Sequence, residues 1–157
     1  MATLNVRLVA PEKDVLDKNV VSVTLPAIEG LLGILPQHSP MLATLAPGVL
    51  SIVQDANTTY RYFIAGGSVE VANDKCVILA ESCTPVDELK VPAYEQNRKA
   101  LIDGRKKESS KSKVAKIDRE IYILDAQQGA IEGKDYIGVP PHHLLDEPDE
   151  ETEKLIF

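Results

Sequence analysis

The sequence contains few cysteines, histidines and aromatic residues, and each shortage excludes a class of functional site. Among 157 residues there are two cysteines, three histidines and no tryptophan, and aromatic residues make up 4% of the chain. The two cysteines, Cys76 and Cys83, form no CxxC pair, so they cannot provide a structural zinc site. So few aromatic side chains do not form a stacking platform for single-stranded nucleic acid.

The balance of charge argues against a nucleic-acid partner. The formal net charge is -7 and the sequence pI is about 5.0, so a phosphate backbone would repel the chain. Basic residues do gather between Lys99 and Lys116, and we interpret this cluster as the solvated face of a helix. Neither of the phosphate-binding glycine motifs, GxxxxGKS/T and GxGxxG, occurs, so we expect no bound cofactor.

The sequence also lacks the hydrophobic runs that direct a chain into or across a membrane. A membrane-spanning helix needs a run of about eighteen or more apolar residues, and the sequence contains no such run. The opening residues MATLNVRLVAPEKD lack the basic start, apolar stretch and cleavage site of a secretory signal. Without an export signal, we expect Cys76 and Cys83 to be reduced, buried and unreactive.

The histidines are the residues of this sequence that are best suited to act as a general base or a metal ligand in an enzyme. His38 lies between Pro36 and Pro40, and as a general base it would indicate a small hydrolase or metal-dependent enzyme. No GxSxG or other nucleophile motif accompanies it, so we favour a turn histidine. His142 and His143 are adjacent, and on an extended chain their side chains point to opposite sides rather than to one metal ion. We therefore expect no catalytic residue and no metal site.

The first half of the chain, from Met1 to about Leu89, has the pattern of short β-strands. Apolar or β-branched runs are separated by turn residues at regular spacing. Within the first run Leu4, Val6 and Leu8 share one face. Three sequences are typical of hairpin turns: Asp55–Asn57, Gly66–Gly67 and Asn73–Asp74. This pattern predicts a β-sandwich or flattened barrel over residues 1–89.

From Pro92 the pattern changes to that of helices. Pro92 suits the first turn of a helix, and helix-forming residues follow to about Glu108, weakened by Gly104. Ser109 and Ser110 then interrupt the pattern and offer an N-cap for a second helix. The second helix carries one apolar stripe, formed by Val114, Ile117, Ile121 and Leu124.

The remaining residues complete this prediction. Gly129 is expected to end the second helix as its C-cap. Helices joined by so short a turn lie antiparallel, so residues 90–130 are predicted to form a helical hairpin. Residues 131–157 are predicted to form an extended acidic tail, because their charge and the Pro140–Pro141 pair oppose a packed helix.

One segment of the β half carries a motif specific enough to indicate a family. Residues 29–52, EGLLGILPQHSPMLATLAPGVLSI, resemble the signature of the ATP synthase epsilon family, which is called delta in mitochondria. The signature is met at Gly30, Gly33, Ile34, Pro36, His38, Pro40, Leu45, Pro47 and Gly48. Residues 63–82, FIAGGSVEVANDKCVILAES, and the opening LNVRLVAPEKDVLD are similar to two further segments of the family.

The resemblance implies a β + α fold and a mechanical function. It implies a ten-stranded N-terminal β-sandwich followed by an antiparallel two-helix hairpin. The function it implies is that of a non-catalytic subunit of the central-stalk rotor, which couples proton-driven rotation of the c-subunit ring to the gamma subunit and the catalytic head. Such a subunit is peripheral to the membrane, on the cytoplasmic face of the bacterial inner membrane or the matrix face of the mitochondrial one. A β-sandwich adaptor of another assembly is the alternative.

The resemblance also implies two contact surfaces. The surface expected to face the c-ring comprises Glu29, Gly30, Leu31, Leu32 and His38. Many relatives have an acidic residue between the two glycines, where this chain has two leucines, so we expect an apolar contact or one through Glu29 and His38. The second surface, on the second helix, comprises Lys111, Lys113, Lys116 and Arg119. These side chains are expected to meet acidic residues of the alpha and beta subunits and to inhibit ATP hydrolysis when the hairpin extends.

Some relatives bind ATP through an I-D-x-x-R-A motif before the first helix. The corresponding residues here are 86–91, VDELKV, in which Lys90 replaces the arginine and Val91 the alanine. A lysine cannot make the bidentate contact that arginine makes with phosphate. We therefore expect no ATP binding. The residues beyond about Ile131 have no counterpart in the family pattern.

Overall fold

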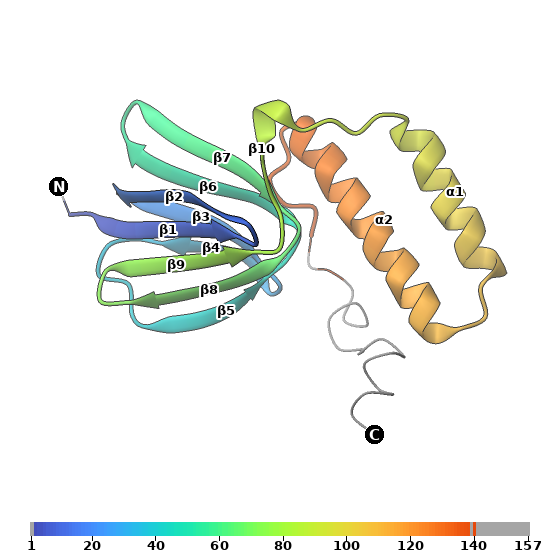
Figure 1. Cartoon of the computed structure of the whole chain (residues 1–157), viewed down its shortest axis with the longest axis horizontal. Coiled ribbons are helices and arrows are strands. Elements are labelled where there is room, and N and C mark those ends of the chain that lie inside the picture. Colours follow the sequence, from blue (N-terminus) through green and yellow to red (C-terminus); the bar gives the residue numbers. More distant parts are fainter. Residues whose placement is uncertain (1, 139, 141–157) are drawn as a thin grey trace, which may run out of the picture.

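The computed structural model describes residues 2–138 and residue 140, and it places a layered β half beside a pair of helices (Figure 1). The strands are β1 (Leu4–Ala10), β2 (Lys13–Val20), β3 (Ser22–Ala27), β4 (Gly30–Ile34), β5 (Met41–Leu45), β6 (Gly48–Asp55), β7 (Thr58–Ile64), β8 (Gly67–Ala72), β9 (Lys75–Ala80) and β10 (Cys83–Pro85). A short 3-10 helix, η1 (Val86–Glu88), leads to α1 (Tyr94–Lys107) and α2 (Lys111–Ile131). The predicted β + α order is confirmed.

The strands form one continuous set of hydrogen-bonded neighbours that folds over on itself. Their spatial order is β10-β7-β6-β3-β5-β8-β9-β1-β2, and β4 pairs with β3 beside this path. Among the described pairs only β1 and β9 run parallel, with Val6 opposite Cys76. The predicted ten-stranded β-sandwich is confirmed.

Apolar residues that alternate along the strands fill the interior of the sandwich. Leu4, Val6 and Leu8 are all buried, as the alternation in β1 predicts, whereas Arg7 is exposed on the other face. Each fully buried aliphatic side chain contributes about 1.5–3 kcal/mol relative to its exposed state. Because such a core packs as densely as an organic crystal, the sandwich is a stiff block.

Two of the three predicted hairpin turns are present. The turn after Asp55 joins β6 to β7, and the Asp55 carboxylate accepts a hydrogen bond from the backbone N–H of Asn57 at 2.8 Å. Asn73 and Asp74 join β8 to β9, and both adopt the positive φ angles that such a turn requires.

The predicted hairpin at Gly66–Gly67 is wrong. The strand before it, β7, pairs with β6 and β10, whereas the strand after it, β8, pairs with β5 and β9. The two glycines instead carry the chain from one set of neighbours to the other, with φ angles of +131° and +147° that L side chains rarely adopt. A glycine pair can adopt these φ angles without forming a tight turn. The glycine pair alone therefore did not show whether a hairpin or a crossing between strand neighbours forms.

The two helices lie antiparallel, as predicted, and α2 is the one beside the sandwich (Figure 1). Ser110 occupies the N-cap position of α2, in agreement with the prediction. Pro92 precedes α1 instead of occupying its first turn, because Ala93 is the N-cap residue. The last strand ends at Pro85 and α1 begins at Tyr94, so the division into domains at residues 89 and 130 stays a prediction.

The predicted C-cap at Gly129 is wrong, because α2 continues to Ile131. Gly133, with a φ angle of +91°, supplies the positive φ that follows the helix, and its N–H donates to the carbonyl of Ala130 at 3.2 Å. The N–H of Lys134 donates to the carbonyl of Gly129 at 2.7 Å. Gly129 does not cap the helix. It lies inside α2, where it is buried in close contact with Ile137.

The predicted acidic tail falls largely outside the described residues, as do His142 and His143. Its first part is described, and it crosses back over the sandwich, where Pro140 is buried. Within the part of the chain that the structure describes, no helix is both long and apolar enough to cross a membrane.

Candidate functional site

The predicted ring-facing residues begin at the turn of the β3–β4 hairpin. Ala27 pairs with Gly30, which places Ile28 and Glu29 at the turn. Glu29 is exposed, and Leu31, which follows Gly30 in β4, is 54% exposed. Leu32 points the other way and packs against the core of the sandwich. The turn and the residue after it therefore expose one carboxylate and one leucine side chain to solvent.

His38 lies apart from these residues. It follows the far end of β4, and a five-residue strand spans about 15 Å. Its loop is fixed to the β8–β9 turn, because the N–H of Gln37 donates to the carboxylate of Asp74. The Nδ1 atom of His38 lies 2.7 Å from the carbonyl oxygen of Ser39. The structure thus places Glu29 and His38 at opposite ends of β4 and does not bring them together.

The surroundings of His38 can be compared with those of a catalytic or metal-binding histidine. Its polar contact is a backbone carbonyl rather than a nucleophile or a carboxylate. In residues 2–138 and 140, no group of three or more histidine, cysteine, aspartate or glutamate side chains is placed to hold a metal ion. Cys76 is fully buried, and burial raises the pKa of its thiol to about 11, so the thiolate is disfavoured.

Exposed leucines on the sandwich are a feature that sequence reasoning missed. Leu35, Leu42 and Leu79 are 61%, 76% and 51% exposed. Leu42 lies in β5, and it lines a groove of ≈ 530 Å³ together with Leu31 of β4. The signal was present in the alternation, because Leu42 is three residues from the buried Leu45 and so must point outward. These side chains are candidates for contact with a partner, because an apolar side chain that stays exposed in the free chain can be buried in an assembly.

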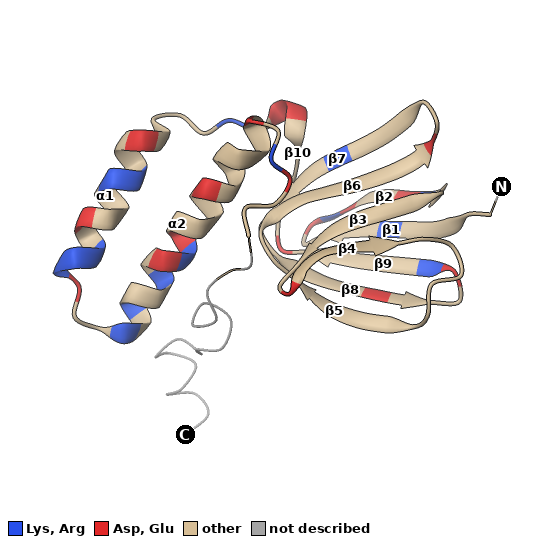
Figure 2. Cartoon of the chain, turned by 180° about the vertical axis from the view of Figure 1, so that it is seen from behind, with Lys and Arg blue, Asp and Glu red and all other residues tan. Residues whose placement is uncertain are grey.

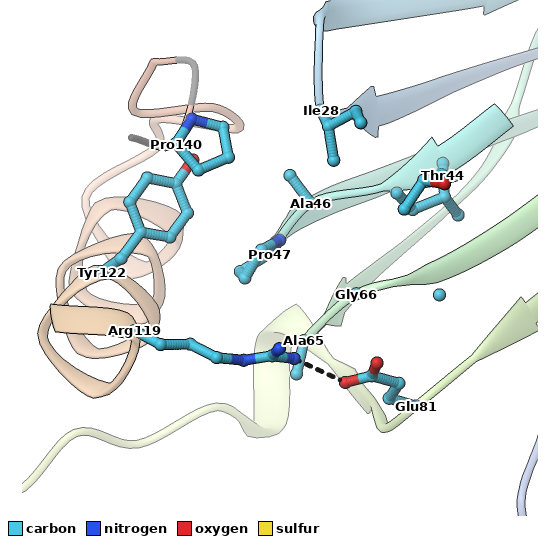
Figure 3. A pocket seen from close by; sticks show the side chains of 12 residues that line it. Ile28, Thr44, Ala46, Pro47, Ala65, Gly66, Glu81, Arg119, Tyr122 and Pro140 are labelled. Atoms are coloured by element: carbon cyan, nitrogen blue, oxygen red, sulfur yellow. Dashed lines mark hydrogen bonds and ion pairs between the residues drawn. The ribbon is translucent and has the colours of Figure 1, made fainter. Parts of the chain in front are cut away.

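The junction between α2 and the sandwich is apolar at its centre. Ala126 and Ala130 of α2 are buried against Val49 of β6 and Phe63 of β7. Beside them a small cavity of ≈ 130 Å³ lies between Tyr122 and the loops of the sandwich (Figure 3). Burial raises the pKa of Tyr122 to about 12. Residues 86–91, which occupy the place of the ATP-binding motif of some relatives, contribute apolar contacts here, because Val86 and Leu89 pack against the same cluster.

The basic residues of α2 divide into two groups. Arg119 forms an ion pair with Glu81 of the sandwich at 2.9 Å, drawn as a dashed line in Figure 3. Lys111, Lys113 and Lys116 are exposed nearer the tip of the hairpin, where basic residues of both helices gather (Figure 2). The predicted contact set is therefore split, with three lysines facing solvent and the arginine engaged with the sandwich.

Ion pairs fix the two helices to each other. Asp125 of α2 accepts hydrogen bonds from the Tyr94 hydroxyl and from Nε of Arg98, the latter at 2.9 Å. The hydrogen bond to Asp125 raises the pKa of the Tyr94 hydroxyl. Nearer the tip, Arg105 of α1 pairs with Asp118 of α2. These contacts hold α1 beside α2 at both ends of the hairpin.

Comparisons with known proteins agree with this arrangement. Residues 3–86 match the family model described as ATP synthase, Delta/Epsilon chain, beta-sandwich domain. The chain is 36% identical over 132 residues to the ATP synthase epsilon chain of Granulibacter bethesdensis, which covers 84% of this chain and 92% of the relative. It is 31% identical over 131 residues to that of Rhodospirillum rubrum, which covers 83% of this chain and 98% of the relative.

The fold has solved counterparts. A chain in the Euglena gracilis mitochondrial ATP synthase structure, OSCP/F1/c-ring in rotational state 1, superposes with a TM-score of 0.73 at 20% identity, covering 83% of this chain and 82% of that one. A chain of the Tetrahymena thermophila mitochondrial ATP synthase central stalk/c-ring superposes with a TM-score of 0.66 at 19% identity, covering 81% of this chain and 95% of that one. The family model spans the whole sandwich, and the two bacterial relatives match well beyond it. The chain belongs to the ATP synthase delta/epsilon chain family.

Proposed function

We propose that this chain is the epsilon-type subunit of the central-stalk rotor in an F-type ATP synthase. It binds the gamma subunit and the c-subunit ring, turns with them and passes torque between them, without catalytic residues of its own. The observation that carries the proposal is the match of the whole sandwich to the delta/epsilon family. A stiff, densely packed block suits a part that must transmit force.

Two surfaces of the sandwich are proposed for the rotor contacts. The β3–β4 turn, with Glu29 and Leu31, is proposed to meet the polar loops of the c-ring. The outward leucines, Leu42 of β5 and Leu79 of β9, are proposed to meet the gamma subunit. Their exposure supports this assignment, because apolar side chains exposed together in the free chain become buried on assembly.

The place of the chain in the cell follows from the same proposal. As part of the rotor it is peripheral to the membrane, held there by the c-ring. It lies on the side that carries the catalytic head, which is the cytoplasmic face of a bacterial inner membrane or the matrix face of a mitochondrial one. Its partners in the head are the alpha and beta subunits.

The proposal also includes a regulatory role for the helical hairpin. When the hairpin is folded on the sandwich, as in Figure 1, turnover is permitted. When it is extended, Lys111, Lys113 and Lys116 are placed against acidic side chains of the head and hydrolysis is blocked. Their exposure near the tip of the hairpin supports this part.

The experiment that tests the rotor role measures coupling. In inverted membrane vesicles that lack the chain, ATP-driven proton pumping should be lost relative to ATP hydrolysis, and the added wild-type chain should restore it. The Leu42→Glu variant should restore it poorly, because a carboxylate at the proposed gamma contact is costly to bury. Thr59→Glu, an exposed position on β7, is the matched control and should restore it fully. Equal pumping with and without the chain would contradict the proposal.

A further inference from the structure

The residues that follow α2 return to the sandwich and bind three of its strands. The N–H of Val49 in β6 donates to the carbonyl oxygen of Asp135 at 2.9 Å. The guanidinium of Arg61 in β7 forms an ion pair with the Asp135 carboxylate. The hydroxyl of Tyr136 donates to the carbonyl of Ala27, at the end of β3, at 3.2 Å.

The same residues bind α2. The Tyr122 hydroxyl donates to the carbonyl of Gly138 at 2.6 Å. Ile137 packs against the cluster that Ala126 and Ala130 form with Val49 and Phe63 of the sandwich. Its side chain also lies so close to Gly129 that a β-carbon there would be 2.9 Å from Cγ2 of Ile137. The segment therefore touches the sandwich on one side and the last turns of α2 on the other.

Small residues allow this close approach from both sides. On the helix, the contact is made over Ala126, Gly129 and Ala130. On the sandwich, a β-carbon on Gly48 would be 2.7 Å from Pro26 and 3.1 Å from the carbonyl oxygen of Asp135. Contacts this close on two faces indicate a seat shaped for the segment rather than a chance contact.

We propose that residues 134–138 are a strap that holds the helical hairpin folded on the sandwich. The hairpin cannot leave the sandwich until the contacts of Asp135, Tyr136 and Ile137 are broken. This inference goes beyond the rotor role, because the strap acts within one chain whether or not the chain is assembled.

The strap adds to the contacts that the hairpin makes directly with the sandwich, which are one ion pair and a small apolar junction. The ion pair between Arg119 and Glu81 joins two exposed side chains, and such pairs contribute little. At the junction Ala126 and Ala130 bury little apolar area each, and Ile123 is the larger α2 side chain packed there. The strap adds a backbone hydrogen bond, two tyrosine hydrogen bonds and the half-buried side chain of Ile137, together with an ion pair that is itself partly exposed.

The test compares one substitution at two positions in the full chain. Ile137→Asp places a charge in the apolar seat of the strap, whereas Ile131→Asp makes the same change at a side chain that is 45% exposed. The measurement is backbone hydrogen exchange of residues 123–131, with the amides of Val6 and Ile78 in the sandwich core as the internal reference. Ile137→Asp should accelerate exchange of the helix amides at least about tenfold and leave the core amides unchanged.

Each outcome decides the proposal. If residues 123–131 exchange equally in the Ile137→Asp and Ile131→Asp variants, the hairpin docks without the strap and the proposal is wrong. If Ile137→Asp also exposes the core amides, the milder Tyr136→Phe decides, because it removes only the hydrogen bond to Ala27. Tyr136→Phe should then accelerate the helix amides about two- to tenfold with the core protected, and no acceleration would overturn the strap.

Discussion

Gly129 of α2 lies directly against Ile137 of the strap, and a β-carbon at position 129 would be 2.9 Å from Cγ2 of that isoleucine. Gly104 of α1 is in the opposite situation, because a β-carbon there would have no neighbour within 4 Å. Both glycines lie inside helices, where glycine is unfavourable. One is therefore required by packing and the other is not.

The first prediction follows from this difference. Gly104→Gln should raise the free energy of unfolding of the hairpin by about 0.5–1 kcal/mol, because glutamine is the better helix former. Gly129→Gln has the same helical benefit, but it should lower stability by about 1–3 kcal/mol because the strap is displaced. Urea unfolding followed by circular dichroism measures both. Equal effects at the two positions would show that Ile137 does not pack as described.

The second prediction concerns the link between β7 and β8. A β-carbon on Gly67 would lie 2.0 Å from the carbonyl oxygen of Leu79, and this backbone atom has no room to move. Gly67→Ala should therefore cost more than about 4 kcal/mol or prevent folding. Gly30→Ala is the control, because its φ angle of +134° is also positive but its β-carbon would meet nothing within 4 Å. It should cost only about 1–3 kcal/mol of backbone strain. A similar thermal unfolding temperature for both variants would contradict this.

The third prediction is a loss of stability at alkaline pH. Burial raises the pKa of the Cys76 thiol from its ordinary value of 9.0 to about 11. As pH rises through this window, the unfolded chain releases the proton while the folded chain keeps it, so the free energy of unfolding falls. The slope for one such thiol approaches ~1.4 kcal/mol per pH unit.

The measurement for this prediction is urea unfolding at about pH 8 and about pH 10. The Cys76→Ala variant should be less stable at the lower pH, because it leaves a small cavity, but it should lose less stability between the two pH values. Cys83, whose pKa burial also raises to about 11, is left in place in both proteins. An identical alkaline loss in wild type and variant would refute the assignment to Cys76.

The fourth prediction joins the strap to regulation. Because the strap opposes extension, we expect Lys111→Glu, Lys113→Glu and Lys116→Glu together to change ATP hydrolysis by the assembled complex less than about twofold. In the Ile137→Asp background the hairpin is released, so hydrolysis should fall, and the three lysine substitutions should restore it. Release without any fall in hydrolysis would contradict the inhibitory contact of the hairpin but would leave the strap itself intact.

The β half was largely predictable because its information is local. The alternation that buries Leu4, Val6 and Leu8 is visible in the sequence, as are the turns after Asp55 and at Asn73. The error at Gly66–Gly67 arose because a positive φ angle is a property of the residue, whereas the choice of neighbouring strand is a property of the whole sheet.

The junction between the strap, α2 and the sandwich was less predictable, because it depends on contacts between residues that are distant in the sequence. In the strap, Asp135 pairs with Arg61 and Tyr136 binds Ala27, and no periodic pattern in the sequence predicts such pairs. Gly129 was assigned to a helix end because glycine is common there, while its burial against Ile137 could not be read from the sequence. The two sets of contact residues taken from the resemblance stay predictions. They are the ring-facing set that begins at Glu29 and the basic set of α2 that ends at Arg119.

The most direct test of the rotor role is to purify the chain with an N-terminal tag from its native membranes after gentle solubilisation. Copurifying proteins are then identified by mass. We predict that the alpha, beta, gamma and c subunits of ATP synthase are recovered together with the tagged chain. Recovery of the intact chain without gamma and c would contradict the account and would leave a β-sandwich adaptor of another assembly.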